Sequence, residues 1–504
     1  MDIFGNILTG FSIAGTWTNL FFCFVGVFFG TLVGVLPGIG PLATMSILLP
    51  VTFGMSPTTA IIMLSGIYYG AYYGGSTTSI LVNIPGEAAS VVTCLDGYKM
   101  ALNGRAGPAL GIAAFGSFIA GTFGLIVLQT ISPVLVTVAL KFGAPEYFSL
   151  MILGLIVLTF LTEKSMVKAL LVAAVGVVMG MVGLDSMTGT ARFTFDIPEL
   201  MDGLGIVPMA MGLFGITEIF LNLEKTIQRS VMASKITGLL PSFQDWMDSK
   251  WAIARGTVVG FFLGMLPGGG GVIASFASYA VEKMCSNHPE KFGHGAIEGV
   301  AGPESANNAA ASAGFVPLLT LGIPVGAVQA VLLGALMIHG ITPGPMLLQE
   351  HPDVFWGVIA SMYIGNVLLL VLNLPLIGLW VKILKVPYGL LFPMILFFCI
   401  IGAYTVNNST TDVGIMLLFG IVGYLMKKFN YEPAPMILAF VLTPILERSL
   451  RQSLLMSSGS FTIFFTQPIS LACLVLAAVL LVLALLPMIR KKREEIVALE
   501  EDAD

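Results

Sequence analysis

The chain has 504 residues, of which 56% are hydrophobic and only 10% are charged. Water-soluble globular chains carry roughly 25% charged residues, so this composition excludes a soluble fold. The formal net charge of -5 at pH 7 provides no basic surface for nucleic acid, and we expect no nucleic-acid partner.

Long uncharged runs predict many helices in a lipid bilayer. No Lys, Arg, Asp or Glu occurs between Asp2 and Glu87, a run about four times the roughly 20 residues that one span requires. Similar runs lie between Arg105 and Lys141, Arg255 and Glu282, Glu304 and Glu350, Asp353 and Lys382, and Arg451 and Arg490. These runs are apolar on every face, whereas the strands of a membrane barrel alternate polar and apolar residues. The sequence therefore predicts an all-α polytopic membrane protein with about 10–13 membrane segments, some of them re-entrant.

Motifs typical of enzymes and metal centres are missing from the sequence. The cysteines and histidines lack metal-ligand spacing, and no CxxC pair suggests a disulfide framework. HExxH, GxSxG and Walker patterns are also missing. We therefore expect no enzymatic activity and no organic cofactor.

Two segments of the chain are similar to each other. GTLVGVLPGIGP, which begins at Gly30, matches GFFLGMLPGGGG, which begins at Gly260, with six identical residues at an offset of 230 positions. Glu218 matches Glu447 later in the chain. Such duplication is typical of secondary transporters. We predict a first membrane repeat over 1–230, a cytoplasmic linker with an interfacial helix over 231–255, a second membrane repeat over 256–465, and a final transmembrane helix with a charged cytoplasmic tail over 466–504.

The distribution of basic residues predicts the orientation. The polar stretch from Glu224 to Arg255 carries five basic and three acidic residues, and the last helix ends in RKKREE from Arg490. By the positive-inside rule both are cytoplasmic, whereas the N-terminal tail has no basic residue and faces outside. The first repeat then crosses the membrane an odd number of times, so the second copy has inverted topology.

Four segments without Lys or Arg are rich in Gly, Pro and small polar residues, and a PGxG inside a span predicts a broken helix. They include LPGIGP around Pro37, YYGGSTTSILVNIPGE from Tyr72, LPGGGG from Leu266 and AGPESANNAAASAG from Ala301. Pro removes a backbone donor, and Gly admits conformations that other residues avoid. Broken helices are tolerated at bilayer depth only inside protein or beside a wet cavity. The exposed N–H groups of a half-helix can hold a carboxylate, and unwound carbonyls can hold a cation.

The candidate site residues are the small and polar residues of these segments. The predicted substrate-binding residues are Gly38, Gly40, Ser76, Thr77, Asn83, Gly268, Gly270, Asn308 and Ser312. The possible Na+ ligands are Ser79, Pro85, Asn307, Thr320 and Pro324. The alternative role for each residue is tight helix packing, the commoner use of a single small residue in a membrane.

These segments contain no Lys or Arg to neutralise an anion. A bound anion then depends on helix ends and on cations bound with it, so Na+ is the favoured coupling ion. The alternative is proton coupling through an acidic residue. The candidates for that role are Glu87, Asp96, Glu298 and Glu304.

The same segments resemble a known family. LPGIGP, GGSTTSILVNIPGE followed by CLDGY, and LPGGGG followed by GPESANNAA resemble the signature blocks of the large permease subunit of the tripartite tricarboxylate transporters. The resemblance extends from about Gly15 to Arg490. It implies a multi-pass protein of the bacterial inner membrane, with a small four-helix membrane subunit and a periplasmic solute-binding protein as partners.

The resemblance also implies import of a small carboxylate, either a tricarboxylate such as citrate or a related di- or aromatic carboxylate, driven by an ion gradient. Inverted repeats favour alternating access of elevator type. Two other functions remain open: a stand-alone ion or solute carrier, and an intramembrane enzyme.

Overall fold

Packing divides the chain into two compact units, each built from two separate stretches of sequence. The computed structural model describes residues 3–36, 40–160, 165–185, 187–224, 238–268, 270–384 and 388–483. Unit 1 comprises residues 1–140 and 205–429, and unit 2 comprises residues 141–204 and 430–504. These units follow packing, whereas the proposed halves 1–230 and 256–465 follow sequence similarity. The division into repeats therefore stays a prediction.

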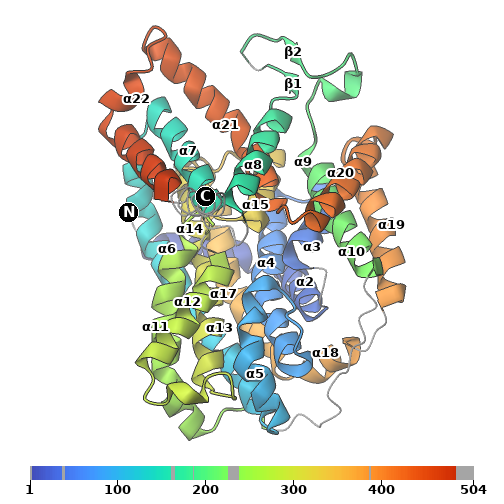
Figure 1. Ribbon diagram of the computed structural model, residues 1–504, viewed down its shortest axis with the longest axis vertical. Coiled ribbons are helices and arrows are strands. Elements are labelled where there is room, and N and C mark those ends of the chain that lie inside the picture. Colours follow the sequence, from blue (N-terminus) through green and yellow to red (C-terminus); the bar gives the residue numbers. More distant parts are fainter. Residues whose placement is uncertain are drawn as a thin grey trace, which may run out of the picture. The chain divides into compact units, whose positions relative to one another are not determined.

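Unit 1 contains most of the helices (Figure 1). Its first stretch forms α1 (Ile3–Ala14), α2 (Trp17–Val35), α3 (Gly40–Leu48), η1 (Leu49–Gly54), α4 (Pro57–Val82), η2 (Ala88–Val91), α5 (Thr93–Leu102) and α6 (Ala106–Ala139). Its second stretch forms α9 (Ile206–Ala210), η4 (Met211–Ile216), α10 (Thr217–Glu224), α11 (Phe243–Gly264), α12 (Gly270–Cys285), η5 (Pro289–Lys291), α13 (Glu298–Ala313), α14 (Phe315–Leu321), α15 (Ala327–Ile338), α16 (Leu347–Glu350), α17 (Pro352–Asn373), α18 (Ile377–Ile383), α19 (Tyr388–Asn407) and α20 (Thr410–Lys428).

Unit 2 is a smaller helical body with a short hairpin. It forms α7 (Ala144–Phe160), α8 (Met166–Gly180), β1 (Gly183–Leu184), β2 (Ala191–Arg192), η3 (Pro198–Leu200), α21 (Ala434–Met456), α22 (Ile463–Thr466) and a helix over Pro468–Leu483. The strands pair antiparallel, with Gly183 opposite Arg192. The prediction of an all-α fold is confirmed except for this hairpin.

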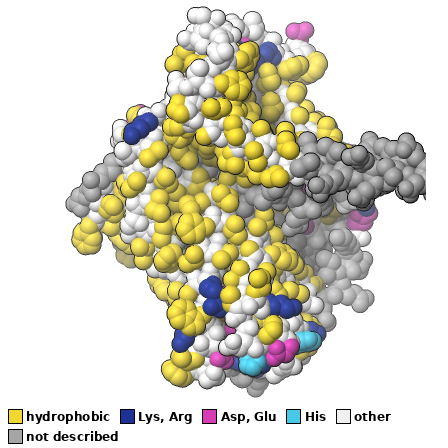
Figure 2. Space-filling model, turned by 60° about the vertical axis from the view of Figure 1, so that its left-hand side comes forward, with side chains coloured by type: hydrophobic (Ala, Val, Ile, Leu, Met, Phe, Trp, Pro, Cys, Tyr) yellow, Lys and Arg dark blue, Asp and Glu magenta, His cyan; other side chains and the backbone are white. Residues whose placement is uncertain are grey.

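Five described helices are long and apolar enough to cross a membrane. They are Trp17–Val35, Ala106–Ala139, the continuous helix Ile206–Glu224, Pro352–Asn373 and Thr410–Lys428. Shorter apolar helices accompany them in both units. Many large apolar side chains are exposed on these helices, as lipid contact requires. Figure 2 shows one face of the molecule, on which hydrophobic side chains are widespread and charged and His side chains are few.

Two helices without exposed residues form the centre of unit 1. Every residue of α4 from Thr58 to Val82 is buried, as is every residue of α13 from Gly299 to Ala313. α2 packs along α4, and α11 packs along α13 beside α12 (Figure 1). Because α4 and α13 carry many small and polar residues, neither is apolar enough to be recognised as a span by hydropathy.

Two sets of glycines, Gly26 and Gly34 on α2 and Gly256 and Gly260 on α11, allow these two close approaches. We call each set a glycine stripe. A Cβ atom at Gly26 or Gly34 would lie 2.2 Å from a carbonyl oxygen of α4. At Gly256 and Gly260 it would lie 2.3 and 2.1 Å from carbonyl oxygens of α13. Gly26 and Gly256 are again 230 positions apart, so the similarity between the segments extends one turn before the sequence match.

The helices break at the two PGxG segments, as predicted, whereas α4 continues unbroken through Gly74 and Gly75 and α13 continues unbroken through Pro303. α2 ends at Val35 and α3 begins at Gly40, with residues 37–39 outside the described part of the chain. α11 ends at Gly264 and α12 begins at Gly270, with Pro267 in the turn between them. α11 begins at Phe243 and runs to Gly264, so the helix predicted in the linker continues without a break into the predicted second repeat.

Candidate functional site

Buried polar side chains from four helices of unit 1 meet around one carboxylate. They are Ser76 of α4, Thr93 of α5, Ser117 of α6, and Glu304, Asn307, Asn308 and Ser312 of α13. We call these residues the Glu304 cluster. Each is at most 5% exposed, so all of their polar atoms must find partners inside the protein.

The carboxylate of Glu304 accepts hydrogen bonds from neutral groups on both of its oxygens. Ser76 Oγ donates to Oε2 at 2.5 Å, and Asn307 Nδ2 donates to the same oxygen at 3.3 Å. Thr93 Oγ1 donates to Oε1. These bonds connect α4 and α5 to α13, segments more than 200 residues apart in the sequence.

The amide of Asn308 connects α13 to α6. Asn308 Nδ2 donates to Ser117 Oγ at 2.8 Å and to the backbone oxygen of Glu304 at 3.1 Å. Ser312, one turn further along α13, donates to the backbone oxygen of Gly121 on α6 at 3.4 Å. The small side chains on both helices allow this approach.

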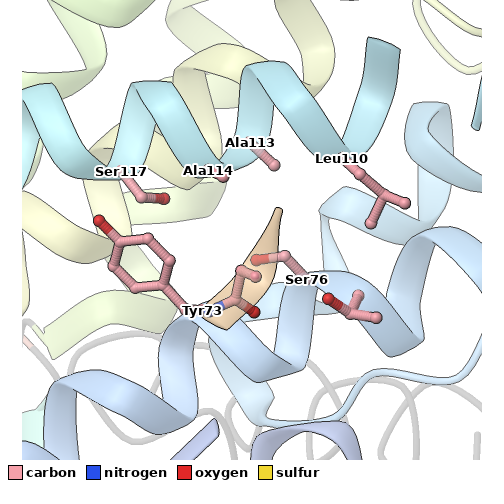
Figure 3. Close-up of a pocket in the computed structure, with 8 residues that line it drawn as sticks. Tyr73, Ser76, Leu110, Ala113, Ala114 and Ser117 are labelled. Carbon is pink, nitrogen blue, oxygen red and sulfur yellow. The ribbon is translucent and has the colours of Figure 1, made fainter. Parts of the chain in front are cut away.

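A small cavity lies between α4 and α6 beside the cluster. Figure 3 shows Tyr73 and Ser76 of α4 facing Ser117 and Ala114 of α6 across it. A second cavity shares Tyr73 and is lined by Asn308 and Ser312. Each has free space for about one water molecule, so a carboxylate can enter only if the lining helices separate.

The side chain of Tyr73 extends the polar lining to α17. Its hydroxyl donates to Asn366 Oδ1 at 2.6 Å, and Asn366 Nδ2 donates to the backbone oxygen of Phe118 at 2.9 Å. An anion between α4 and α6 would therefore meet hydroxyl and amide groups and no basic side chain.

A second group of predicted residues lies at the helix breaks. Gly40, Gly268 and Gly270 have positive φ angles of 68°, 76° and 42°, which only glycine adopts without cost. The N–H of Gly268 donates to the backbone oxygen of Val325 at 2.6 Å, which joins the break after α11 to the segment after α14. Gly38 lies outside the described residues.

The ends of α4 and α14 have the same form. Asn83 ends α4 with φ 58°, and Gly322 ends α14 with φ 71°. Each is followed by Ile-Pro, so Pro85 and Pro324 stand at equivalent places after a left-handed helix end. Asn83 is exposed, whereas Pro324 is buried.

The remaining predicted Na+ ligands bond to backbone carbonyls near them in sequence. Ser79 Oγ donates to the backbone oxygen of Ser90 at 2.9 Å, and Thr320 Oγ1 donates to that of Val316 at 2.7 Å. Thr77 lines the cavity between α4 and α6. The structure thus gathers Ser76, Asn307, Asn308 and Ser312 in the cluster and places the other predicted residues around it or at the breaks.

Sequence reasoning did not select several residues of this site. Thr93, Ser117, Tyr73 and Asn366 are all buried, and each contacts a predicted residue or lines a cavity with one. A signal was present for two of them, because Ser117 and Asn366 are polar residues inside long apolar helices. Polar residues in such helices are candidates for a pathway through the membrane as well as for helix packing.

An ion pair compensates the charge of two other buried acids of unit 1. Glu282 pairs with Arg255 at 2.5 Å, and Asp245 pairs with Arg105. Within the part of the chain that the structure describes, Glu304 has no ion pair with Lys, Arg or His.

A comparison with known protein families finds a match over most of the chain. The family model described as "Tripartite tricarboxylate transporter TctA family" matches residues 20–438, which include both glycine stripes, both breaks and the Glu304 cluster. The match ends within unit 2, after the start of α21.

Several relatives are themselves uncharacterised. An uncharacterised 52.8 kDa protein from the TAR-I ttuC' 3' region of Agrobacterium vitis is 54% identical over 502 residues, covering all of both chains. A second protein of Agrobacterium vitis, from the TAR-II ttuC' 3' region, is 56% identical over 237 residues, which are 47% of this chain and 98% of that protein. A protein of Methanocaldococcus jannaschii is 24% identical over 255 residues, or 50% of this chain and 58% of that protein.

No solved structure matches the chain. A family model over most of the sequence, together with apolar helices of membrane-spanning length, identifies a multi-pass membrane transporter subunit of a tripartite system. The chain therefore belongs to the tripartite tricarboxylate transporter TctA family, as its large permease subunit.

Proposed function

We propose that the chain is the permease of a secondary transporter that imports a small carboxylate across the bacterial inner membrane. The substrate is a tricarboxylate such as citrate, or a related di- or aromatic carboxylate. A periplasmic solute-binding protein delivers it, and a small four-helix membrane subunit completes the complex. The observation that carries the proposal is a buried hydroxyl- and amide-lined cavity between α4 and α6, next to two broken helix pairs.

The lining favours a carboxylate because it offers hydroxyl and amide donors, and no charged side chain lines either cavity. Ser76, Ser117 and Asn308 present hydroxyl and amide groups that can reorganise from their present partners toward a bound anion. The turns at Gly40 and Gly270 begin helices whose first N–H groups have no partner within the helix. A carboxylate held by such donors requires no fixed cation.

A cation gradient drives the import in this proposal. Na+ is the preferred coupling ion and H+ the alternative. Ser79, Asn307 and Thr320 offer hard oxygen atoms of the kind that Na+ prefers, and the backbone around Pro85 and Pro324 offers carbonyl groups outside regular helix. Because each cavity has room for only about one water molecule, binding and release of a carboxylate there require helix movement, which alternating access of elevator type would supply.

Uptake into proteoliposomes tests this function. The permease is reconstituted with and without the small subunit and the cognate binding protein, and labelled citrate, a dicarboxylate and an aromatic carboxylate are offered in turn. The proposal expects accumulation of at least one of them only when all three components are present. Removal of Na+ at fixed pH, and collapse of the pH gradient at fixed Na+, then identify the coupling ion.

Two results would replace the proposal with another function. Accumulation by this chain alone would indicate a stand-alone carrier. Chemical conversion of a substrate by the detergent-solubilised chain, without transport, would indicate an enzyme. When site variants are compared in this assay, Gly414→Ala is the matched control. A Cβ atom at that position would meet nothing within 4 Å, so the substitution should leave uptake unchanged.

A further inference from the structure

Four acidic residues were considered above as candidates for proton coupling. One of them, Asp96, has a structural role. One of its carboxylate oxygens accepts hydrogen bonds from the backbone N–H groups of Gly293, Gly295 and Ala296 at 2.9, 2.7 and 2.8 Å. The other accepts from Tyr279 OH at 2.9 Å. Since the N–H groups would be orphaned without this carboxylate, Asp96 anchors the turn before α13 to α5.

Glu87 and Glu298 are less enclosed. Glu87 caps η2 by accepting the backbone N–H of Ala89 at 2.7 Å, and its side chain is partly exposed. Glu298 is the first residue of α13 and is also partly exposed. Acidic residues in both positions stabilise helix starts, although Oε1 of Glu87 is buried and has no hydrogen-bond partner among the described residues.

Glu304 differs from Glu87 and Glu298 because it is fully buried. It differs from Asp96, which is also 0% exposed and also has no ion pair among the described residues, because side chains and not the backbone of a turn donate to its carboxylate. Its exposure is 0%, and its side-chain donors are two hydroxyls and one amide. An ionised carboxylate buried in this way is very costly unless a cation compensates it. Two ways to remove that cost are a proton on the carboxyl group and a metal cation among the surrounding oxygens.

The titratable groups that face Glu304 do not supply the missing positive charge. Tyr73 of α4, Glu87 before η2 and Cys94 of α5 all interact with it electrostatically, and none is cationic. On α11 and α12, the charges packed against α13 are Arg255 and Glu282, which neutralise each other. Asp96 on α5 is held by the turn before α13. α6 has no charged residue within its span Ala106–Ala139.

The carboxylate also lies beside the cavity proposed for the substrate. Ser76 donates to Glu304 Oε2 and lines the cavity, and Ser117 donates to the backbone oxygen of Glu304 and lines the same cavity. An anion bound to these hydroxyls would be close to an ionised Glu304, and the two like charges would repel each other strongly in this buried site. Neutral Glu304 removes that repulsion.

We propose that Glu304 is the site where the coupling cation binds, and that neutralisation of its carboxylate by that cation allows the anionic substrate to occupy the adjacent cavity. This inference rests on the proposed function. It makes cation binding a condition for substrate binding, so the two are transported together. The monovalent cation is Na+ or H+, since both neutralise one carboxylate and both suit a site of hydroxyl and amide oxygens.

The variant Glu304→Gln tests the assignment in the reconstituted three-component system. Glutamine has nearly the shape of glutamate and is permanently neutral, so it imitates the cation-bound state. We expect gradient-driven accumulation of labelled carboxylate to fall at least tenfold, while exchange of internal unlabelled for external labelled carboxylate persists. The exchange should no longer depend on Na+ or on pH, whichever affects the wild type.

Glu304→Asp and Glu282→Gln complete the experiment. Glu304→Asp keeps the charge and should retain accumulation with a shifted dependence on the cation. Glu282→Gln is the matched control, because Arg255 already compensates that buried carboxylate, and it should keep the wild-type cation dependence. Size-exclusion profiles in detergent establish that each variant folds.

The outcomes separate this inference from the proposed function. Accumulation by Glu304→Gln with wild-type dependence on Na+ and pH overturns the assignment while leaving carboxylate import intact. Loss of both accumulation and exchange in a folded Glu304→Gln, with Glu304→Asp equally inactive, also overturns it, because Glu304 would then serve binding or structure. If the wild-type complex takes up no carboxylate at all, the proposed function itself fails.

Discussion

The replacement Gly260→Ala tests whether close contact between α11 and α13 supports the site. The new Cβ atom would lie 2.1 Å from the backbone oxygen of Ala306, whereas ordinary contact begins at 3.4 Å. The helices must therefore separate by about 1.3 Å at this point, which is the difference between those two distances. A gap of about 0.5–1 Å already forfeits a quarter to a half of each dispersion contact. We expect a loss of about 1–3 kcal/mol in the free energy of unfolding, the usual cost of overpacking.

The measurement is an SDS-induced unfolding titration in mixed micelles, with carboxylate uptake in proteoliposomes as the functional readout. Uptake should fall as well, because the displaced segment of α13 carries Glu304 and Asn308. Gly414→Ala on α20 is the control, since its Cβ atom would meet nothing within 4 Å and alanine favours a helix by roughly 0.5–1 kcal/mol. If Gly260→Ala unfolds at the same SDS concentration as the wild type, the packing account of the glycine stripes is wrong.

Further predictions concern three other positions. Asn83→Ala should lower the free energy of unfolding by about 1 kcal/mol, because the left-handed backbone conformation at the end of α4 is unfavourable for alanine. Asn83→Gly should unfold like the wild type. Equal losses in both variants would show that the backbone conformation is not the cause. Asn308→Ala should strongly reduce uptake while membrane insertion, read by fractionation and blotting, stays normal; wild-type uptake would remove Asn308 from the site. The pKa of Asp185 is lowered, chiefly by the backbone N–H of Met187 and next by Arg451, so its stabilising effect is present above the ordinary aspartate pKa of about 3.9 and is lost as pH falls toward the lower folded pKa. Melting temperatures of wild type and Asp185→Asn should therefore differ most near pH 7, and the difference should begin to shrink as the pH falls below about 3.9; a constant difference would contradict this reasoning.

Local chemistry explains why the helix breaks could be predicted from the sequence. Pro267 blocks the hydrogen bonding of a preceding turn, and the glycines after it adopt conformations that end a helix, wherever the segment lies in the fold. The same holds for the left-handed ends at Asn83 and Gly322, each followed by Ile-Pro. These features depend on a few neighbouring residues and are therefore readable from sequence.

The partners of Glu304 could not be predicted in the same way. Thr93 and Ser76 lie 211 and 228 positions before it, and Asn308 reaches Ser117 across 191 positions. Such contacts depend on how four helices pack, and residue spacing within one helix carries no information about the helix opposite. The polar residues of the Gly-rich segments were recognisable in the sequence as candidate site residues. Only the packing of the helices distinguished Glu304 from the other three acids considered for proton coupling.

Burial also explains why hydropathy does not identify the central helices α4 and α13 as membrane spans. α4 and α13 contact other helices on all sides, so they carry glycine, serine and asparagine where a lipid-facing helix would carry leucine or valine. Small and polar residues such as these suit a helix that is surrounded by protein, and they do not raise the mean hydropathy of the segment.

The position of a bound carboxylate in a structure of the complete three-component complex tests the central claim most directly. The account predicts carboxylate density between α4 and α6, within hydrogen-bonding distance of Ser76, Ser117 or Asn308, in a cavity wider than the present one. Density bound elsewhere, with the Glu304 cluster still closed as it is here, would contradict it.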